Sequence, residues 1–576
     1  MYDLLIRNGR VMDGTGAPWF HGDVGVTDGK IVAIGKLGSK AKRVIDAKER
    51  IVAPGFIDNH CHFDAQVTWD PLCTFSCYNG VTTVVIGNCS LGLAPVRPGD
   101  GYMLNQMLSR VEAIPMDALQ AGVDWRWNSI GEYMDILDRQ AGVNVSVMIS
   151  HSAVRRYVMG DESQTRVEST PAELEEMKKI LRDGMYAGAA GISFTRNQAQ
   201  FDDIGKPLPS LIASFDELMA LASVLGELGV GTMQMGGGSL PEMEDGLCSK
   251  LSEISGRPVF YNSISQHPGS DSWRKHLDHI ERVAKRGVRA RPLLRPVPAS
   301  QFFTLRNAQM FDQSPTWKPI MLMPKAQQMA LFANPEIRKK LWKEAVSGEG
   351  MDPTNTRFSR RWDLVTVVAT KLPKNAGLIG KSIDRIAKEQ GRDVLDVFLD
   401  LALEEDLETT FEYFQRNGDP EAMATLLRSP YPLVGDSDSG AHVVFNAYYG
   451  FASYFFQRWI RELGVMSWEE GVRKMSALSA EAFGIHDRGL LQPGLAADIV
   501  VFDPDTIAPE RTHEVHDFPA GAGRMKQVSR GIQCTVVNGQ VFVEGGEHTG
   551  VYPGQVVRGA LYKDGPAGAR RRTAAE

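Results

Sequence analysis

The sequence lacks the features that mark secreted, membrane and nucleic-acid-binding proteins. Six cysteines in 576 residues are too few for a disulfide framework in so long a chain. No uninterrupted apolar run approaches membrane-spanning length, and the first residues lack the basic and apolar regions of a signal peptide. A net charge of −7 provides no basic patch for nucleic acid. We therefore expect a reduced, cytoplasmic protein without a nucleic-acid or membrane partner, and a homo-oligomer stays open.

The two ends of the chain resemble each other in composition and differ from the middle. Both are rich in β-forming residues broken by Asn-Gly and Asp-Gly, which are hairpin signals. Because chain termini often lie close together, we expect residues 1–55 and 485–562 to form one small β-sandwich domain. Residues 563–576 carry no apolar pattern and are expected to be a flexible tail.

The middle of the chain alternates short β runs with helical patterns. With the strand before His60 there are about eight β runs, the number that closes a parallel barrel. The other runs lie near residues 82–86, 143–149, 190–194, 230–234, 258–261, 288–290 and 432–435. We therefore predict an α/β protein with a TIM-like (β/α)8 barrel over residues 56–484. Residues 295–425 are too many for one crossover and predict a helical insertion or lid.

Two histidines close together follow the first of these strands. His60 and His62 are two residues apart, a spacing that points both side chains to the same side of an extended chain. Imidazole is a good zinc ligand, so one metal ion could take both. The pair alone is a weak signal, since such pairs also occur by chance on surfaces.

Other reactive residues also lie where predicted strands end, as an active site on a parallel barrel requires. Cys89 follows the second strand, His151 the third, and Asp436 and Asp438 the last. Two histidines, a thiolate and a carboxylate at one mouth make a suitable set for a divalent metal. Taken singly, Cys89 could be a small buried apolar residue and Asp438 a helix cap, and the agreement of four residues favours the metal site.

These segments together resemble the metal-dependent amidohydrolase superfamily, and within it the N-acyl-D-amino-acid deacylase group. Segment 54–64 matches the superfamily's opening motif, and segment 437–442 resembles the aspartate motif of the last strand. Segment 80–89 resembles the deacylase group specifically, because that group places a cysteine where many relatives use a carbamylated lysine. Segment 488–500 resembles the return into the β domain. The resemblance covers nearly the whole chain and implies a TIM-like barrel, a small β-sandwich and hydrolysis of an amide-type bond.

The chain departs from that group at the fifth and sixth strands. Well-known members add a metal-binding histidine on each, whereas here Gln234 ends the fifth strand and the sixth leads to Asn262, Ser265 and His267. We therefore expect one zinc, or another divalent transition metal, per chain, held by His60, His62, Cys89 and Asp438 or a subset. The lysine that those deacylases use near the substrate carboxylate is also missing, which favours recognition of a group other than a free amino-acid carboxylate.

The expected chemistry follows from these ligands. A divalent metal activates water at neutral pH, and Asp438 is the expected general base that passes the proton to the leaving nitrogen. His151 is a candidate for the oxyanion contact, with a core role as the alternative. Arg155, Arg196 and Gln234 are candidates for substrate binding, although structural salt bridges are a simpler account of both arginines.

Two classes of function are compatible with a chain of this kind. The first is a metal-dependent hydrolase of a small acyl-amide substrate, with an N-acyl-amino-acid deacylase favoured and other amides, cyclic amides, ureas or lactones as alternatives. The second is a non-catalytic scaffold with an amidohydrolase-like barrel. A scaffold has no reason to keep His60, His62, Cys89 and Asp438 together, so the hydrolase is preferred.

Overall fold

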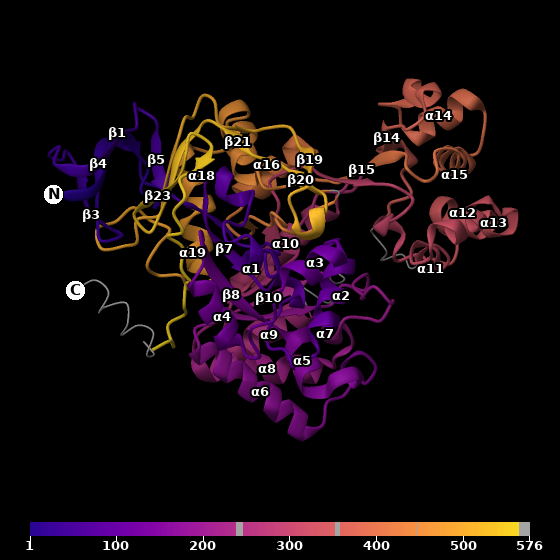
Figure 1. Ribbon diagram of the computed structural model, residues 1–576, viewed down its shortest axis with the longest axis horizontal. Helices are drawn as coiled ribbons and strands as arrows, with labels where there is room; N and C mark the ends of the chain where they lie inside the picture. Colours follow the sequence, from indigo (N-terminus) through magenta and orange to yellow (C-terminus); the bar gives the residue numbers. More distant parts are fainter. Residues whose placement is uncertain (238–245, 352–357, 445, 564–576) are drawn as a thin grey trace.

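An eight-stranded parallel sheet forms the centre of the protein in the computed structural model, which describes residues 1–237, 246–351, 358–444 and 446–563 (Figure 1). Its order from one edge to the other is β16-β12-β11-β10-β9-β8-β7-β6. In chain order the strands are β6 (Phe56–Asp58), β7 (Val81–Ile86), β8 (Asn144–Ser150), β9 (Gly191–Thr195), β10 (Thr232–Gly236), β11 (Val259–Tyr261), β12 (Ala290–Leu294) and β16 (Leu433–Val434). Each strand expected from the sequence is therefore present, within a few residues.

The sheet curls so that its two edge strands are joined just beyond their ends. Cys61, after β6, forms a parallel bridge with Ser439, after β16. The Asp438 amide also donates to the His60 carbonyl at 3.1 Å, and the His62 amide to the Ser439 carbonyl at 2.7 Å. This arrangement agrees with a TIM-like barrel, and the joined ends carry three of the four predicted metal ligands, His60, His62 and Asp438.

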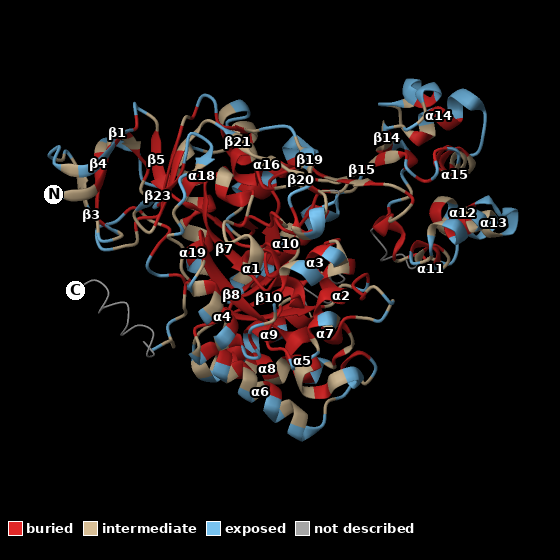
Figure 2. Cartoon of the chain, in the orientation of Figure 1, coloured by how far each residue is buried: buried red, intermediate tan, exposed pale blue. Residues whose placement is uncertain are grey.

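Helices cover the outside of the sheet, which leaves its strands buried on both faces (Figure 2). Strand β7 reads as an unbroken run of buried residues for this reason. The main helices are α2 (Gly101–Val111), α4 (Ile130–Asp138), α5 (His151–Met159), α6 (Pro171–Tyr186), α8 (Phe215–Leu228), α9 (Leu247–Ser255), α10 (Ser272–Lys285), α16 (Pro420–Arg428), α18 (Trp468–Met475) and α19 (Ala477–Ala482). Helix α6 begins with a capping box of Thr170 and Glu173. None of the described helices is both long and apolar enough to span a membrane.

Both ends of the chain contribute to a second, nine-stranded sheet. Strand β5 pairs with β1 from the N-terminal part and with β17 from the C-terminal part. The strands are β1 (Tyr2–Val11), β2 (Phe20–Thr27), β3 (Lys30–Gly35), β4 (Ala41–Asp46), β5 (Ile51–Pro54), β17 (Ile499–Phe502), β22 (Ile532–Val537), β23 (Gln540–Glu544) and β24 (Glu547–His548). Packing of two sheets into a sandwich stays a prediction. The expected tail, apart from Lys563, lies outside the described residues.

The insertion between β12 and β16 forms a lobe beside the barrel that contains both helices and strands (Figure 1). It contains a three-stranded antiparallel sheet in the order β13-β15-β14. Its elements are β13 (Ala299–Phe303), α11 (Trp317–Met321), α12 (Lys325–Ala333), α13 (Pro335–Trp342), β14 (Val365–Ala369), α14 (Ile383–Gln390), α15 (Val394–Glu404) and β15 (Thr410–Arg416). A hydrophobic cluster of its own, drawn from residues 303–413, holds it together. The long segment therefore folds around a separate core and returns to the barrel through β15.

Replacing Phe398 by alanine should destabilise the insertion and spare the barrel. The Phe398 ring is fully buried, with its centroid 4.8 Å from that of Phe411 and 5.0 Å from that of Trp362. Loss of a buried phenylalanine typically costs about 3–5 kcal/mol. Hydrogen exchange should show faster exchange of amides in the insertion, with strands β7 to β10 still protected.

Phe56→Ala is the matched control, because Phe56 is equally buried in the barrel core. That variant should raise exchange in the barrel strands. Equal loss of protection in the barrel by Phe398→Ala would contradict a separate core.

Candidate metal centre

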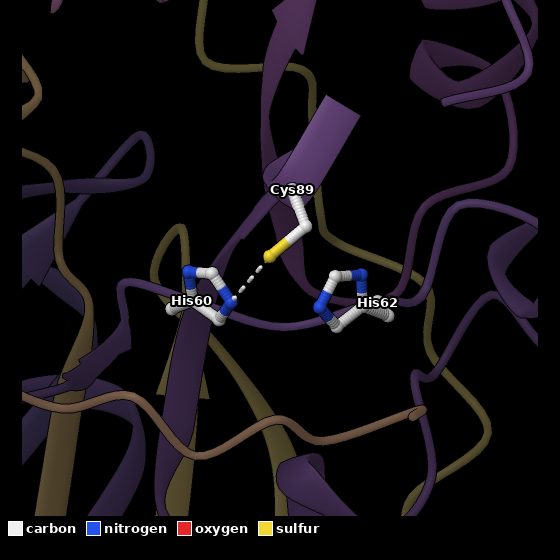
Figure 3. A group of neighbouring side chains, drawn as sticks. All are labelled: His60, His62 and Cys89. Atoms are coloured by element: carbon white, nitrogen blue, oxygen red, sulfur yellow. Dashed lines mark hydrogen bonds between the residues drawn. The ribbon is translucent and has the colours of Figure 1, made fainter. Parts of the chain in front are cut away.

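The two predicted histidines lie side by side after β6 (Figure 3). His60 and His62 are both buried, and their ring centroids are 5.2 Å apart with the planes nearly perpendicular. The Nε2 atom of His60 is 3.5 Å from the sulfur of Cys89. Their ligand atoms and that of Cys89 all lie within 4.8 Å of one another. Three of the four predicted metal ligands therefore converge.

A tight turn after β7 brings Cys89 to the histidines. Gly87 has a φ of +81°, and a Cβ atom there would lie 2.1 Å from the carbonyl oxygen of Met148, so only glycine fits. Cys89 itself has a φ of +51°, an uncommon conformation for a residue other than glycine. Such backbone strain is typical of functional sites, where the surrounding structure enforces it.

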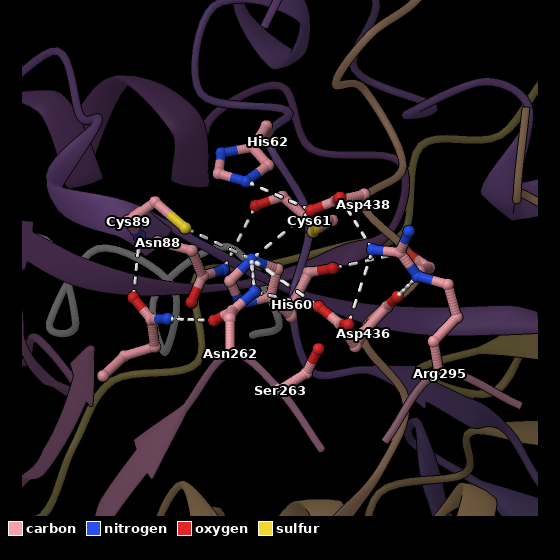
Figure 4. Close-up of polar contacts among 12 residues, drawn as sticks. His60, Cys61, His62, Asn88, Cys89, Asn262, Ser263, Arg295, Asp436 and Asp438 are labelled. Atoms are coloured by element: carbon pink, nitrogen blue, oxygen red, sulfur yellow. Dashed lines mark hydrogen bonds and ion pairs between the residues drawn. The ribbon is translucent and has the colours of Figure 1, made fainter. Parts of the chain in front are cut away.

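Asp438 brings a carboxylate to the same cluster from the loop after β16 (Figure 4). Its Oδ1 atom is 3.5 Å from the Nε2 atom of His60 and 3.5 Å from that of His62. Its Oδ2 atom accepts a 2.7 Å hydrogen bond from Arg295. Asp436, two residues earlier, lies further away, with its Oδ1 atom 4.0 Å from His60 Nε2.

The electrostatics of the cluster favour anionic ligands beside the imidazoles. Burial disfavours the charged form of His60, but the Cys89 thiolate and Asp438 outweigh it and raise the pKa of His60 to about 10. Burial raises the pKa of Cys89, yet His60 and His62 together bring it below its usual value. For Asp438, burial is outweighed by Arg295 and the histidines, which hold its pKa well below the usual range. Thiolate and carboxylate are the forms that bind metal ions.

The donor set fits a divalent metal ion. Two imidazoles, a thiol and a carboxylate are all zinc ligands, with bonds of about 2.0–2.3 Å that place tetrahedral ligand atoms about 3.3–3.8 Å apart. The 3.5 Å separations of His60 Nε2 from Cys89 Sγ and from Asp438 Oδ1 lie in that range. Since a metal ion competes with protons for such ligands, its affinity falls as pH falls.

Two amide side chains come from the fifth and sixth strands of the barrel sheet, Gln234 from within β10 and Asn262 from just after β11. Gln234 accepts a 2.7 Å hydrogen bond from the Cys89 amide and donates to the side-chain oxygen of Asn262 at 2.6 Å. The Asn262 amide nitrogen lies 3.1 Å from His60 Nε2 and 3.0 Å from an oxygen of Asp436. Gln234, predicted to bind substrate, is hydrogen-bonded to the backbone of Cys89, and its contact with a substrate stays a prediction. Of the strand-six candidates, Asn262 is the one that contacts the cluster.

Two residues of the site were missed by the sequence reasoning. Arg295 follows strand β12 and contacts both Asp436 and Asp438, so its place at a strand end was an available signal. Glu112 follows helix α2 and lies 3.6 Å from Nδ1 of His62, on the opposite side of the ring from Asp438. At 3.6 Å the contact is an ion pair and not a hydrogen bond, so Glu112 acts on the His62 ring through its charge. Nothing local in the sequence marks Glu112.

His151 and Arg155 lie in a separate buried network instead of at the cluster. Helix α5 begins at His151, and both ring nitrogens have partners at 2.9 Å, Ser210 on one side and Glu217 on the other. Arg155 is fully buried, pairs with the same Glu217 and donates to the backbone carbonyls of Ser163, within η3 (Gly160–Gln164), and of Val167, after it. These contacts match the alternative roles considered above, a core histidine and a structural salt bridge.

Arg196 is also engaged by the fold. Its guanidinium donates to the carbonyls of Leu211 and Ala213 at 2.7 and 3.0 Å. It also lies over the ring of Phe215, 4.7 Å from the centroid. These contacts hold the start of helix α8, so the structure does not bring Arg196 into the cluster of His60.

Glu217→Gln should destabilise the protein strongly at neutral pH. Although burial raises the pKa of Glu217, His151 and Arg155 lower it to about 2, so the carboxylate stabilises the fold above about pH 4.5 and this contribution is lost as pH falls through about 2. Removing one partner of a buried pair costs about 3–5 kcal/mol. Urea unfolding should show that loss at pH 7 and a smaller one at pH 3.

Glu175→Gln removes an exposed carboxylate that pairs with Lys178, and it should cost less than about 1 kcal/mol. A Glu217→Gln variant as stable as this control would contradict the structural role of the network.

Comparison with known proteins places this geometry in a family. Residues 43–249 and 359–543 match the family model described as Amidohydrolase family. A Mycobacterium tuberculosis protein described as uncharacterized is 30% identical, covering 97% of this chain and 95% of that protein. D-aminoacylase of Alcaligenes xylosoxydans xylosoxydans is 27% identical, covering 96% and 97%. The crystal structure of N-acyl-D-glutamate deacylase from Bordetella bronchiseptica, complexed with zinc and a phosphonate inhibitor, matches with a TM-score of 0.65 at 26% identity, covering 97% and 99%. The chain belongs to the amidohydrolase family.

Proposed function

We propose that this protein uses one divalent metal ion, zinc in the first instance, to remove the acyl group from N-acyl amino acids. As a family member it is a hydrolase of carbon–nitrogen bonds other than peptide bonds. The observation that carries the proposal is the convergence of His60, His62, Cys89 and Asp438 at the joined ends of β6 and β16. Full-length similarity to D-aminoacylase and to N-acyl-D-glutamate deacylase supports the substrate class.

His60, His62, Cys89 and Asp438, or a subset of them that leaves a position for water, would hold the ion. A bound divalent metal supplies Lewis-acid activation of water and of the substrate carbonyl. One ion is favoured over two because Gln234, within the fifth strand, and Asn262, just after the sixth, occupy the places where the resemblance predicts histidines. Carboxamides are poor ligands for zinc compared with imidazole.

Asp438 acts as the general base in this proposal. Arg295 holds its Oδ2 atom, which leaves Oδ1 facing the two histidines. Because its pKa is held low, the carboxylate is ionised at neutral pH and can accept a proton from the attacking water. It then delivers that proton to the leaving nitrogen, so the products are a carboxylic acid and an amine.

We assign a structural role to His151, Arg155 and Arg196, and not a role in catalysis or substrate binding. Their polar atoms contact Glu217, Ser210 and backbone carbonyls, and those contacts would have to break before any of them could reach a substrate. Gln234 is a positioning residue for Cys89 through its hydrogen bond to the Cys89 amide.

A second candidate is hydrolysis of a neutral amide, cyclic amide, urea or lactone. The absence of the deacylase group's strand-six lysine favours it. A panel of N-acyl-D-amino acids, N-acyl-L-amino acids, anilides and cyclic amides, assayed with the zinc-loaded protein, separates the two. Turnover of the N-acyl amino acids alone supports the proposal, and turnover of cyclic amides alone replaces it. No turnover and no bound metal would indicate a scaffold.

Asp438→Asn should lower kcat by about 10²–10⁴-fold, because the amide cannot accept the water proton. The measurement is steady-state hydrolysis of the best substrate, with zinc content determined on the same sample. His60, His62 and Cys89 remain in the variant, so we expect metal to be retained at reduced affinity.

Asp505→Asn is the control, since Asp505 is exposed in the loop after β17 and should leave kcat unchanged. Full activity of Asp438→Asn with metal bound would exclude Asp438 as the base.

A further inference from the structure

Strand β15 of the insertion ends against the barrel loops that carry the site. Asn417, just after this strand, is buried and donates from its backbone amide to the Gln266 carbonyl at 2.8 Å. Its side chain accepts from the Gln266 amide at 3.0 Å and donates to the Arg295 carbonyl at 3.1 Å. Gln266 follows β11 and Arg295 follows β12, so the end of β15 is fixed beside the loops after both strands. Figure 1 shows β15 running between the insertion and the barrel.

Arg416, the last residue of β15, has a charge that the described residues leave unpaired. Its Nε atom is buried without a hydrogen bond, and its guanidinium has no ion pair with a described residue. The carboxylates of Asp436 and Asp438 interact with it electrostatically, but Arg295 already holds both. Arg416 as a whole is half-buried, and a buried guanidinium nitrogen without a partner in a native protein requires an explanation.

Arg416 lies near a second arginine as well as near the two aspartates. Arg295 is a second buried guanidinium near it, and burial together with Arg295 lowers the pKa of Arg416. Burial and Arg416 in turn lower the pKa of His267 to about 4. A small anion placed here would therefore gain favourable interactions that no described side chain supplies.

We propose that Arg416 binds the carboxylate of the substrate, so that the insertion, and not the sixth strand, provides the anion anchor. The proposal rests on the proposed function and narrows it to anionic N-acyl amino acids. In such a substrate the carboxylate and the amide nitrogen are attached to the same carbon. When the amide carbonyl of the substrate lies at the metal centre, its carboxylate would therefore lie a few ångströms from that centre. The planar guanidinium of Arg416 suits bidentate binding of a carboxylate.

This assignment accounts for two features of the chain together. The lysine expected near the substrate carboxylate is missing from the sixth strand, and Arg155 and Arg196, the other candidate anchors, are held by the fold. Arg416 supplies a positive charge from a different element. It is a specificity-determining residue, because it touches the part of the substrate that does not react.

The first test compares N-acetyl-D-alanine with its primary amide, N-acetyl-D-alaninamide, in the wild-type zinc enzyme and in Arg416→Gln. We expect kcat/KM for the carboxylate to fall by about 10–100-fold, mainly through KM, as for loss of a charge-assisted contact. Activity on the neutral amide should change less than about threefold. Arg416→Lys keeps the charge without the bidentate geometry and should give an intermediate loss.

Arg385→Gln is the matched control, because it removes an arginine charge from helix α14 of the same insertion, where it pairs with Glu389 at the surface. It should behave as wild type on both compounds. Equal losses of Arg416→Gln on the carboxylate and the amide, or no loss on either, would overturn the assignment.

A binding experiment makes the result independent of turnover. Calorimetry of N-acetyl-D-alanine and N-acetyl-D-alaninamide with Asp438→Asn, alone and combined with Arg416→Gln, measures the anchor without hydrolysis. Carboxylate binding that depends on Arg416, in a wild-type protein that hydrolyses neither compound, would refute the deacylase function and support the anion site. Hydrolysis of N-acetyl-D-alanine that ignores Arg416, or binding of neither compound, would refute the anion site.

Discussion

The site depends on one carboxylate, that of Asp438, held between a buried guanidinium and two imidazoles. Arg295 binds one oxygen at 2.7 Å, and the other lies 3.5 Å from each of His60 and His62. The backbone reinforces this contact, because the Asp438 amide donates to the His60 carbonyl and so joins the two edges of the sheet. The contact that joins the two edges of the sheet therefore also brings Asp438 to the histidines.

The barrel supplies the predicted metal ligands, and the insertion contacts the loops around them. The barrel sheet supplies the ligands from strand ends, supported by Gln234, Asn262 and Glu112 around them. The insertion has its own hydrophobic core and touches the site through the end of β15, where Asn417 is anchored to barrel loops. Residues of a lobe with its own core can be substituted without disturbing the metal ligands in the barrel.

The parts that sequence reasoning predicted are those encoded locally. Strand–helix alternation and the spacing of His60 and His62 are read from neighbouring residues, and Cys89 and Asp438 follow from their places at strand ends. Position at a strand end does not determine where a side chain points, and His151 shows this: helix α5 begins there and its ring contacts Glu217. Arg295 was missed because its role depends on Asp438, a residue far along the chain. The sheet within the insertion was missed because its strands pair across long helical stretches.

The measurement that tests the account most directly is zinc stoichiometry combined with X-ray absorption at the zinc edge. We expect about one zinc per chain, coordinated by a single sulfur at about 2.3 Å and by nitrogen or oxygen ligands at about 2.0–2.1 Å. The sulfur contribution should disappear in Cys89→Ser. Two ions per chain, or one ion without a sulfur ligand, would contradict a single-metal centre built on His60, His62, Cys89 and Asp438.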